Sequence, residues 1–70
     1  MRVSLKDSGN LREKIAKLGL TQKQFSVKID VTPKYLSAIL CERKNPSPRL
    51  AKVIAYQLKV SPSDLFYYTA

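Results

Sequence analysis

Apolar residues recur every three or four positions in several short stretches of the chain, a spacing that places them on one face of a helix. The stretches span residues 11–18, 25–29, 36–40 and 50–58, and Leu65 and Phe66 form a last apolar pair. Polar residues, prolines or a glycine separate the stretches. The pattern predicts an all-α fold, a compact bundle of about five short helices joined by tight turns.

A residue suited to capping stands before each stretch. Ser, Thr and Asn side chains accept hydrogen bonds from the free N–H groups at a helix start, and proline suits the first helical position because it lacks an N–H. The predicted caps are Asn10, Thr21, Thr32, Ser47 and Ser61, and the last three each precede a proline. Gly19 suits the left-handed conformation that often closes a helix, so the first helix should end there.

Residues 21–31 predict a short helix followed by a sharp turn. Thr21 and Gln24 have the spacing of a capping box, in which each side chain bonds the other residue's backbone N–H. Phe25 and Ile29 lie one helical turn apart and share a face. Asp30 then interrupts the pattern, and Asp tolerates the left-handed backbone that a sharp turn needs.

The next helix, predicted over residues 32–41, has two unlike faces. One face is apolar and predicts core packing; it carries Leu36, Ile39 and Leu40. The opposite face is small and polar, and it carries Lys34, Ser37, Ala38 and Cys41. Two short helices with a tight turn between them, the second presenting such a face, are typical of a helix-turn-helix that binds DNA.

Seventy residues allow one small domain. Residues 1–9 predict an N-terminal arm, in which Val3 and Leu5 alternate with polar residues and fit a brief extended segment. Residues 10–67 predict the helical domain.

The charge balance favours a polyanionic partner. Thirteen Lys and Arg residues against five Asp and Glu residues give a net charge of +8, and nucleic acid is the commonest partner of such a domain. The alternative is a protein that is merely basic. No stretch approaches the roughly 20 apolar residues that span a bilayer, and no signal-peptide pattern opens the chain, so we expect a cytoplasmic protein without membrane contact.

The residue sets of common enzymes are missing from the sequence. There is no His, one Cys and only five scattered acidic residues, so a zinc site is excluded and general acid–base chemistry has few groups to use. Cys41 has no His to activate it and is expected to fill space at a helix end. We therefore expect no enzyme activity, no metal and no other cofactor.

Residues 11–66 resemble the lambda-repressor-like helix-turn-helix domain of phage repressors, Cro proteins and Xre-type regulators. The matching segments are Gly19-Leu20-Thr21-Gln22, Phe25-Ser26, Val31-Thr32, Leu36-Ser37-Ala38-Ile39, Asn45-Pro46-Ser47, Ile54-Ala55, Leu58, Val60-Ser61 and Leu65-Phe66. The chain has Asp30 and Glu42 where the family usually has Gly, and Leu40 where it usually has Glu. The resemblance implies sequence-specific binding of double-stranded DNA by a transcriptional regulator, a repressor of Cro/Xre type.

The resemblance also implies which residues meet DNA. The helix over residues 32–41 would enter the major groove, with base contacts from Pro33, Lys34, Ser37 and Ala38. Lys34 is the best candidate for specific recognition because Lys can donate to guanine O6 and N7; the alternatives are a phosphate contact or a solvated side chain. The implied phosphate contacts are Gln22, Lys23, Thr32, Tyr35, Arg43, Lys44 and Asn45.

A single recognition helix reads few base pairs, so a homodimer over an inverted repeat is expected on DNA. The candidate dimer surface comprises Val53, Leu65, Phe66, Tyr67 and Tyr68; alternatively, Phe66, Tyr67 and Tyr68 merely close the core. The competing function is a protein-interaction module, such as an antitoxin-like domain that binds a protein partner.

Overall fold

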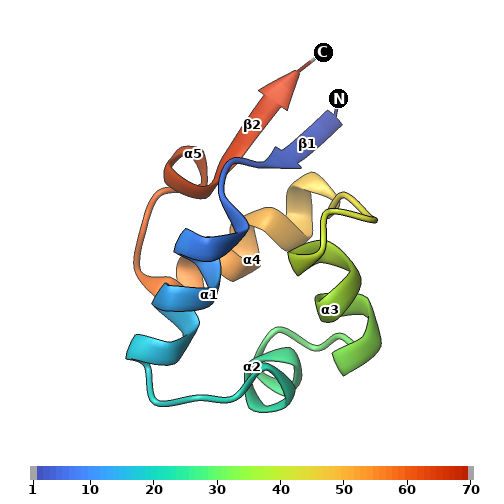
Figure 1. Cartoon of the computed structure of the whole chain (residues 1–70). Coiled ribbons are helices and arrows are strands. Elements are labelled where there is room, and N and C mark those ends of the chain that lie inside the picture. Colours follow the sequence, from blue (N-terminus) through green and yellow to red (C-terminus); the bar gives the residue numbers. More distant parts are fainter. Residues whose placement is uncertain (1, 70) are drawn as a thin grey trace.

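Five helices surround one apolar core, and two short strands close one end of it in the computed structural model, which describes residues 2–69 (Figure 1). Met1, the first residue of the predicted arm, lies outside the described residues. The elements in chain order are β1 (Arg2–Leu5), α1 (Ser8–Lys17), α2 (Gln22–Lys28), α3 (Pro33–Leu40), α4 (Pro48–Leu58), α5 (Pro62–Leu65) and β2 (Phe66–Thr69). The predicted helix-turn-helix corresponds to α2 and α3.

The five predicted helices are present, and the two short strands are an addition to the expected all-α fold. β1 and β2 pair antiparallel, with Val3 opposite Tyr68 and Leu5 opposite Phe66 (Figure 1). Val3 and Leu5 are buried, because alternate residues of a strand face the same side and this side covers the core. The extended segment predicted around these residues is therefore present, and residues 2–5 of the predicted arm are part of the packed domain.

The first helix begins earlier than predicted. Its cap is Asp7 and not Asn10: the Asp7 carboxylate accepts hydrogen bonds from the backbone N–H groups of Gly9 at 2.9 Å and Asn10 at 3.3 Å. Asp caps as well as Asn does, and here it precedes Asn10 in the chain. The predicted caps Thr21, Thr32 and Ser47 are confirmed by side-chain hydrogen bonds to the first turns of α2, α3 and α4.

At the ends of three helices, a residue other than glycine adopts the left-handed conformation. Asp30 has φ 60°, Glu42 has φ 60° and Lys59 has φ 58°, and Gly19 closes α1 with φ 75°. The left-handed turns predicted at Gly19 and Asp30 are confirmed. At Asp30 and Glu42 the two backbone hydrogen bonds of a Schellman motif are present, for example from Val31 N–H to the Ser26 carbonyl at 3.0 Å.

The predicted apolar stripes form the core. Phe25, Leu36, Ile39 and Ile54 have no exposed surface, and Ser26, the one buried polar residue among residues 2–69, donates to the Lys23 carbonyl at 2.6 Å. Leu18 is the exception, since 44% of it is exposed. The chain turns at Gly19, directly after Leu18, and Leu20 packs against the core in its place.

Replacing Val3 by Ala tests whether β1 is part of the core. Val3 is 2% exposed, so the lost methyl groups should lower the free energy of unfolding by about 2 kcal/mol, as measured by urea denaturation. Ser4→Ala is the matched control, because Ser4 points to the other face of β1 and should change the free energy of unfolding by less than about 0.5 kcal/mol. Equal effects of the two substitutions would show that β1 does not cover the core.

Candidate nucleic-acid interface

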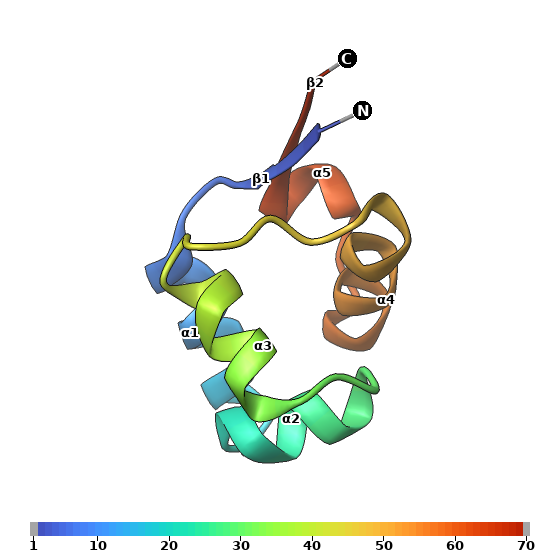
Figure 2. The same ribbon diagram turned by 90° about the vertical axis from the view of Figure 1, so that its right-hand side faces the viewer.

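The turn between α2 and α3 fixes how α3 lies on the surface. At the start of α2, Thr21 N–H donates to Gln24 Oε1 at 2.9 Å and Gln24 N–H donates to Thr21 Oγ1 at 3.1 Å, so the predicted capping box is confirmed. Asp30 reverses the chain after α2, and α3 then crosses α2 at the front of the molecule (Figure 2). A turn closed by backbone bonds on one side and a cap on the other leaves α3 little freedom to change direction.

α3 buries one face and exposes the other. Leu36, Ile39 and Leu40 are at most 1% exposed. Pro33 and Lys34 are exposed, whereas Ser37 and Ala38 are half-buried. Thr32 Oγ1 accepts a hydrogen bond from Tyr35 N–H at 3.1 Å, so the cap holds the first turn. Side chains at the centre of the outer face are short and project little from the helix, so this face is low. One long cation, Lys34, lies at its N-terminal end.

The loop after α3 folds back onto this face. Six residues from the helix and the loop line one hollow: Thr32, Lys34, Tyr35, Ala38, Arg43 and Lys44. The Ala38 carbonyl accepts hydrogen bonds from Arg43 N–H at 2.9 Å and Lys44 N–H at 3.3 Å. The left-handed Glu42 makes this geometry possible, because it reverses the chain directly after α3.

Lys44 also contacts α3 through its side chain. Its Nζ lies 5.8 Å from the centroid of the Tyr35 ring, within the range of a cation–π interaction. Tyr35 is half-buried, which leaves its outer surface in the hollow. The loop cations and the helix thus form one positively charged concave surface.

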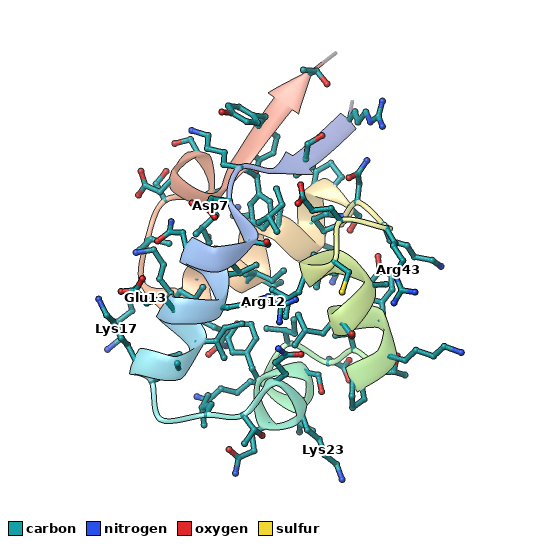
Figure 3. The ribbon with its side chains drawn as sticks, viewed as in Figure 1. Asp7, Arg12, Glu13, Lys17, Lys23 and Arg43 are labelled. Atoms are coloured by element: carbon teal, nitrogen blue, oxygen red, sulfur yellow. The ribbon has the colours of Figure 1, made fainter. Side chains whose placement is uncertain are left out.

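Five of the predicted contact residues lie outside the hollow: Gln22, Lys23, Pro33, Ser37 and Asn45. Gln22 and Lys23 are exposed on the first turn of α2, and Lys23 extends away from the body of the molecule (Figure 3). Asn45 is exposed in the loop. Six of the predicted residues therefore line the hollow, and the other five lie outside it on α2, on α3 and in the loop after α3.

Arg12 was not among the contact residues predicted from the sequence. It extends from α1 toward α3 (Figure 3), and its Nη2 atom donates to Cys41 Sγ at 3.9 Å. The one ion pair among residues 2–69 joins Lys17 and Glu13 at 3.2 Å, so the carboxylate next to Arg12 in sequence pairs with a different cation. Arg12 and Cys41 are 29 positions apart, and no local pattern indicates that they meet.

Two predictions for side chains near these elements were wrong. Cys41 was expected to fill space at the end of α3, but it is exposed at the C-terminal cap of the helix, which agrees with its predicted place on the polar face. Leu65 and Phe66 were included in a dimer surface, but both are only 1% exposed, because α5 and β2 turn them into the core. Of the other residues of that predicted surface, Tyr67 and Tyr68 are exposed and Val53 is half-buried.

Two further observations concern the described part of the chain. Within residues 2–69, no group of three or more His, Cys, Asp or Glu side chains is arranged to hold a metal ion. None of the helices in the same range has the length and apolar character needed to cross a membrane.

Comparison with known proteins places this geometry in a family. A comparison with curated proteins finds no match to the sequence. Residues 11–65 match a family model described as helix-turn-helix, and this segment contains α2, the turn at Asp30, α3 and α4. On this match over most of its length, the chain belongs to the lambda repressor/Xre-like helix-turn-helix family, a family of DNA-binding transcription regulators.

Proposed function

We propose that this chain is a sequence-specific repressor of the Cro/Xre type that reads the major groove of double-stranded DNA with the outer face of α3. The observation that carries the proposal is the concave surface where Lys34 and Ala38 of α3 meet the loop cations Arg43 and Lys44. A low helix face suits the floor of the major groove, and cations at its border suit the phosphates that flank the groove.

The outer face of α3 offers a short set of base contacts. Lys34 is exposed and can donate to guanine O6 and N7. Ser37 can donate to or accept from a base edge, and the Ala38 methyl group can pack on a thymine methyl. Pro33 has no N–H and offers only apolar contact. Because Lys34 is the one long donor in this set, we assign most of the base preference to it.

Phosphate contacts would come from three parts of the chain. Arg43, Lys44 and Asn45 belong to the loop after α3, whose backbone is anchored to the Ala38 carbonyl. Gln22, Lys23, Thr32 and Tyr35 come from the starts of α2 and α3. Arg12 adds a cation from α1, because its guanidinium reaches Cys41 at the C-terminal end of α3, the end opposite Lys34. Such contacts orient a protein on DNA without reading its sequence.

Repression is the regulatory outcome that needs the fewest additional contacts. A domain that occupies a groove excludes other proteins from the same base pairs, and this exclusion requires nothing beyond DNA binding itself. Activation would require a second, productive contact with another protein.

Replacing Lys34 by Ala should cost about 1–3 kcal/mol of binding free energy on the best site and relax the preference at one base pair. Affinity is measured by fluorescence anisotropy on a site selected from random duplex DNA and on its single-base variants. If Lys34→Ala weakens binding to every duplex by the same factor, Lys34 contacts a phosphate and the assignment to a base is wrong.

Removing cations should change the salt dependence of binding and leave the sequence preference intact. Each phosphate contact contributes about 0.9 to the slope of log affinity against log salt concentration. Arg43→Ala and Arg12→Ala should each lower the slope by about one, and the Arg43→Ala, Lys44→Ala double variant by about two.

Lys17→Ala is the control for these slopes, because Lys17 lies on α1 like Arg12 but pairs with Glu13. It should leave the slope unchanged. An unchanged slope in the loop double variant would remove the loop from the interface, and an unchanged slope in Arg12→Ala would remove Arg12 alone.

We also propose that two chains bind one operator that is an inverted repeat, with their α3 helices about 34–36 Å apart in successive major grooves. Leu65 and Phe66 are buried, and Val53 is half-buried beside Arg49 and Lys52, which a two-fold contact would bring face to face. The remaining candidates for the contact are therefore Tyr67 and Tyr68, which are exposed on β2. Titration of a selected site should give two chains per duplex. One chain per duplex, together with a selected sequence that lacks symmetry, would exclude the dimer and leave DNA binding unaffected.

A further inference from the structure

A second surface, on the outer side of α4, combines apolar side chains with cations. Tyr56 of α4 is 78% exposed, the largest exposed fraction among the exposed large apolar residues of the described chain. Two hollows meet at Tyr56: Val53, Val60 and Pro62 line one, and Leu18 and Leu20 line the other. These six residues are named the Tyr56 surface.

All charged residues that line the two hollows are cations. Arg49 and Lys52 border the first hollow, and Lys28 and Lys59 border the second. Among residues 2–69, no carboxylate lines either hollow. An adjoining hollow includes Asp30, beside Lys28 and Arg49. Positive charge therefore surrounds an apolar centre.

This surface is distinct from the DNA-binding surface proposed above. None of its residues, and none of the four cations around it, lines the hollow formed by α3 and the loop after it. In Figure 2, α3 lies at the front of the molecule and α4 at its right-hand side. The adjoining hollow lies between the two surfaces, because Tyr35 and Arg49 both line it. A molecule bound at Tyr56 would leave Lys34 and Ala38 accessible.

We infer that the Tyr56 surface binds an acidic amphipathic segment of another protein. Apolar side chains of such a segment would pack on Tyr56 and into the hollows on either side of it, where exposed apolar area marks interaction sites. Its carboxylates would meet the four surrounding cations, and complementary charge of this kind selects partners and speeds their association. This inference goes beyond DNA binding and does not depend on it.

The charge distribution argues against two other occupants. A second copy of the chain would place the same four cations opposite themselves, and like charges brought together at an interface oppose binding. Duplex DNA would neutralise the cations but would leave Val53, Val60 and Pro62 without an apolar partner. An acidic segment with an apolar face satisfies both components of the surface.

Two synthetic peptides test the inference on the full chain. The first is an amphipathic helix of about 18 residues with Leu at positions i, i+3, i+4 and i+7 and Glu at the others, and the second carries Lys in place of each Glu. In a titration followed by ¹⁵N NMR, the acidic peptide should shift the backbone amide signals of Val53, Tyr56 and Val60 and leave those of Lys34 and Ser37 in place. The basic peptide should shift none of them.

A pair of variants locates the binding site. Tyr56→Ser should weaken binding of the acidic peptide by at least about tenfold, since exposed aromatic anchors dominate such contacts. Val27→Ser is the matched control, because Val27 is 73% exposed on α2 and does not line either hollow. The control should leave peptide binding unchanged, and circular dichroism should show both variants folded.

Several results would overturn the inference. These are equal binding of the two peptides, no binding of the acidic peptide, or equal loss of binding in the two variants. Shifts of the Val53, Tyr56 and Val60 signals on raising the protein concentration without peptide would identify a second copy as the occupant instead. DNA affinity of Tyr56→Ser, measured in parallel, should equal that of the unsubstituted chain. Failure of the DNA-binding proposal would appear separately, as absence of DNA binding by every variant.

Discussion

The burial of one face of α3 is the interaction on which the arrangement of the molecule depends. α3 has eight residues, fewer than an isolated helix needs to be stable in water. It is helical because Leu36, Ile39 and Leu40 lie in the core with Phe25 of α2. The same packing decides which side chains remain outside, so the core that stabilises α3 also determines the direction in which Lys34, Ser37 and Ala38 face.

The backbone turns at the two ends of the helix-turn-helix complete this constraint. Asp30 and Glu42 both adopt left-handed conformations that cost a non-glycine residue roughly 1 kcal/mol, and the hydrogen bonds of the turns offset part of that cost. The second turn has a direct consequence for the surface. The Ala38 carbonyl accepts hydrogen bonds from the backbone of Arg43 and Lys44. The loop proposed to contact phosphates is therefore fixed to the helix proposed to contact bases.

The parts of the structure that depend on neighbours in sequence could be predicted from sequence. Capping of α2 by Thr21 and Gln24, the turn at Asp30 and the buried stripes all arise from residues within a few positions of one another, and local physical chemistry decides them. The cap at Asp7 was missed because two suitable residues, Asp7 and Asn10, compete within one turn. Gly19 indicated correctly where α1 ends but not that Leu18 would remain exposed.

The remaining features depend on residues that are far apart in the chain. β1 pairs with β2 from the opposite end of the sequence. Each strand has four residues, and its sequence does not indicate which other strand it pairs with. Arg12 meets Cys41 only because α1 packs beside α3. Burial of Phe66 likewise depends on this pairing, since Leu5 of β1 lies opposite it. The six residues that line the concave surface were among the predicted DNA contacts. The shape of the surface could not be predicted, because it depends on how the loop folds back onto Ala38.

The central claim is that the outer face of α3 is the surface that contacts DNA. The most direct test is a ¹⁵N NMR titration of the full chain with a duplex selected from random DNA. The largest changes in backbone amide signals should fall on Lys34, Ser37 and Ala38, with smaller changes at Gln22 and Arg43. Changes concentrated on α4 and β2, with the signals of α3 unmoved, would contradict the account.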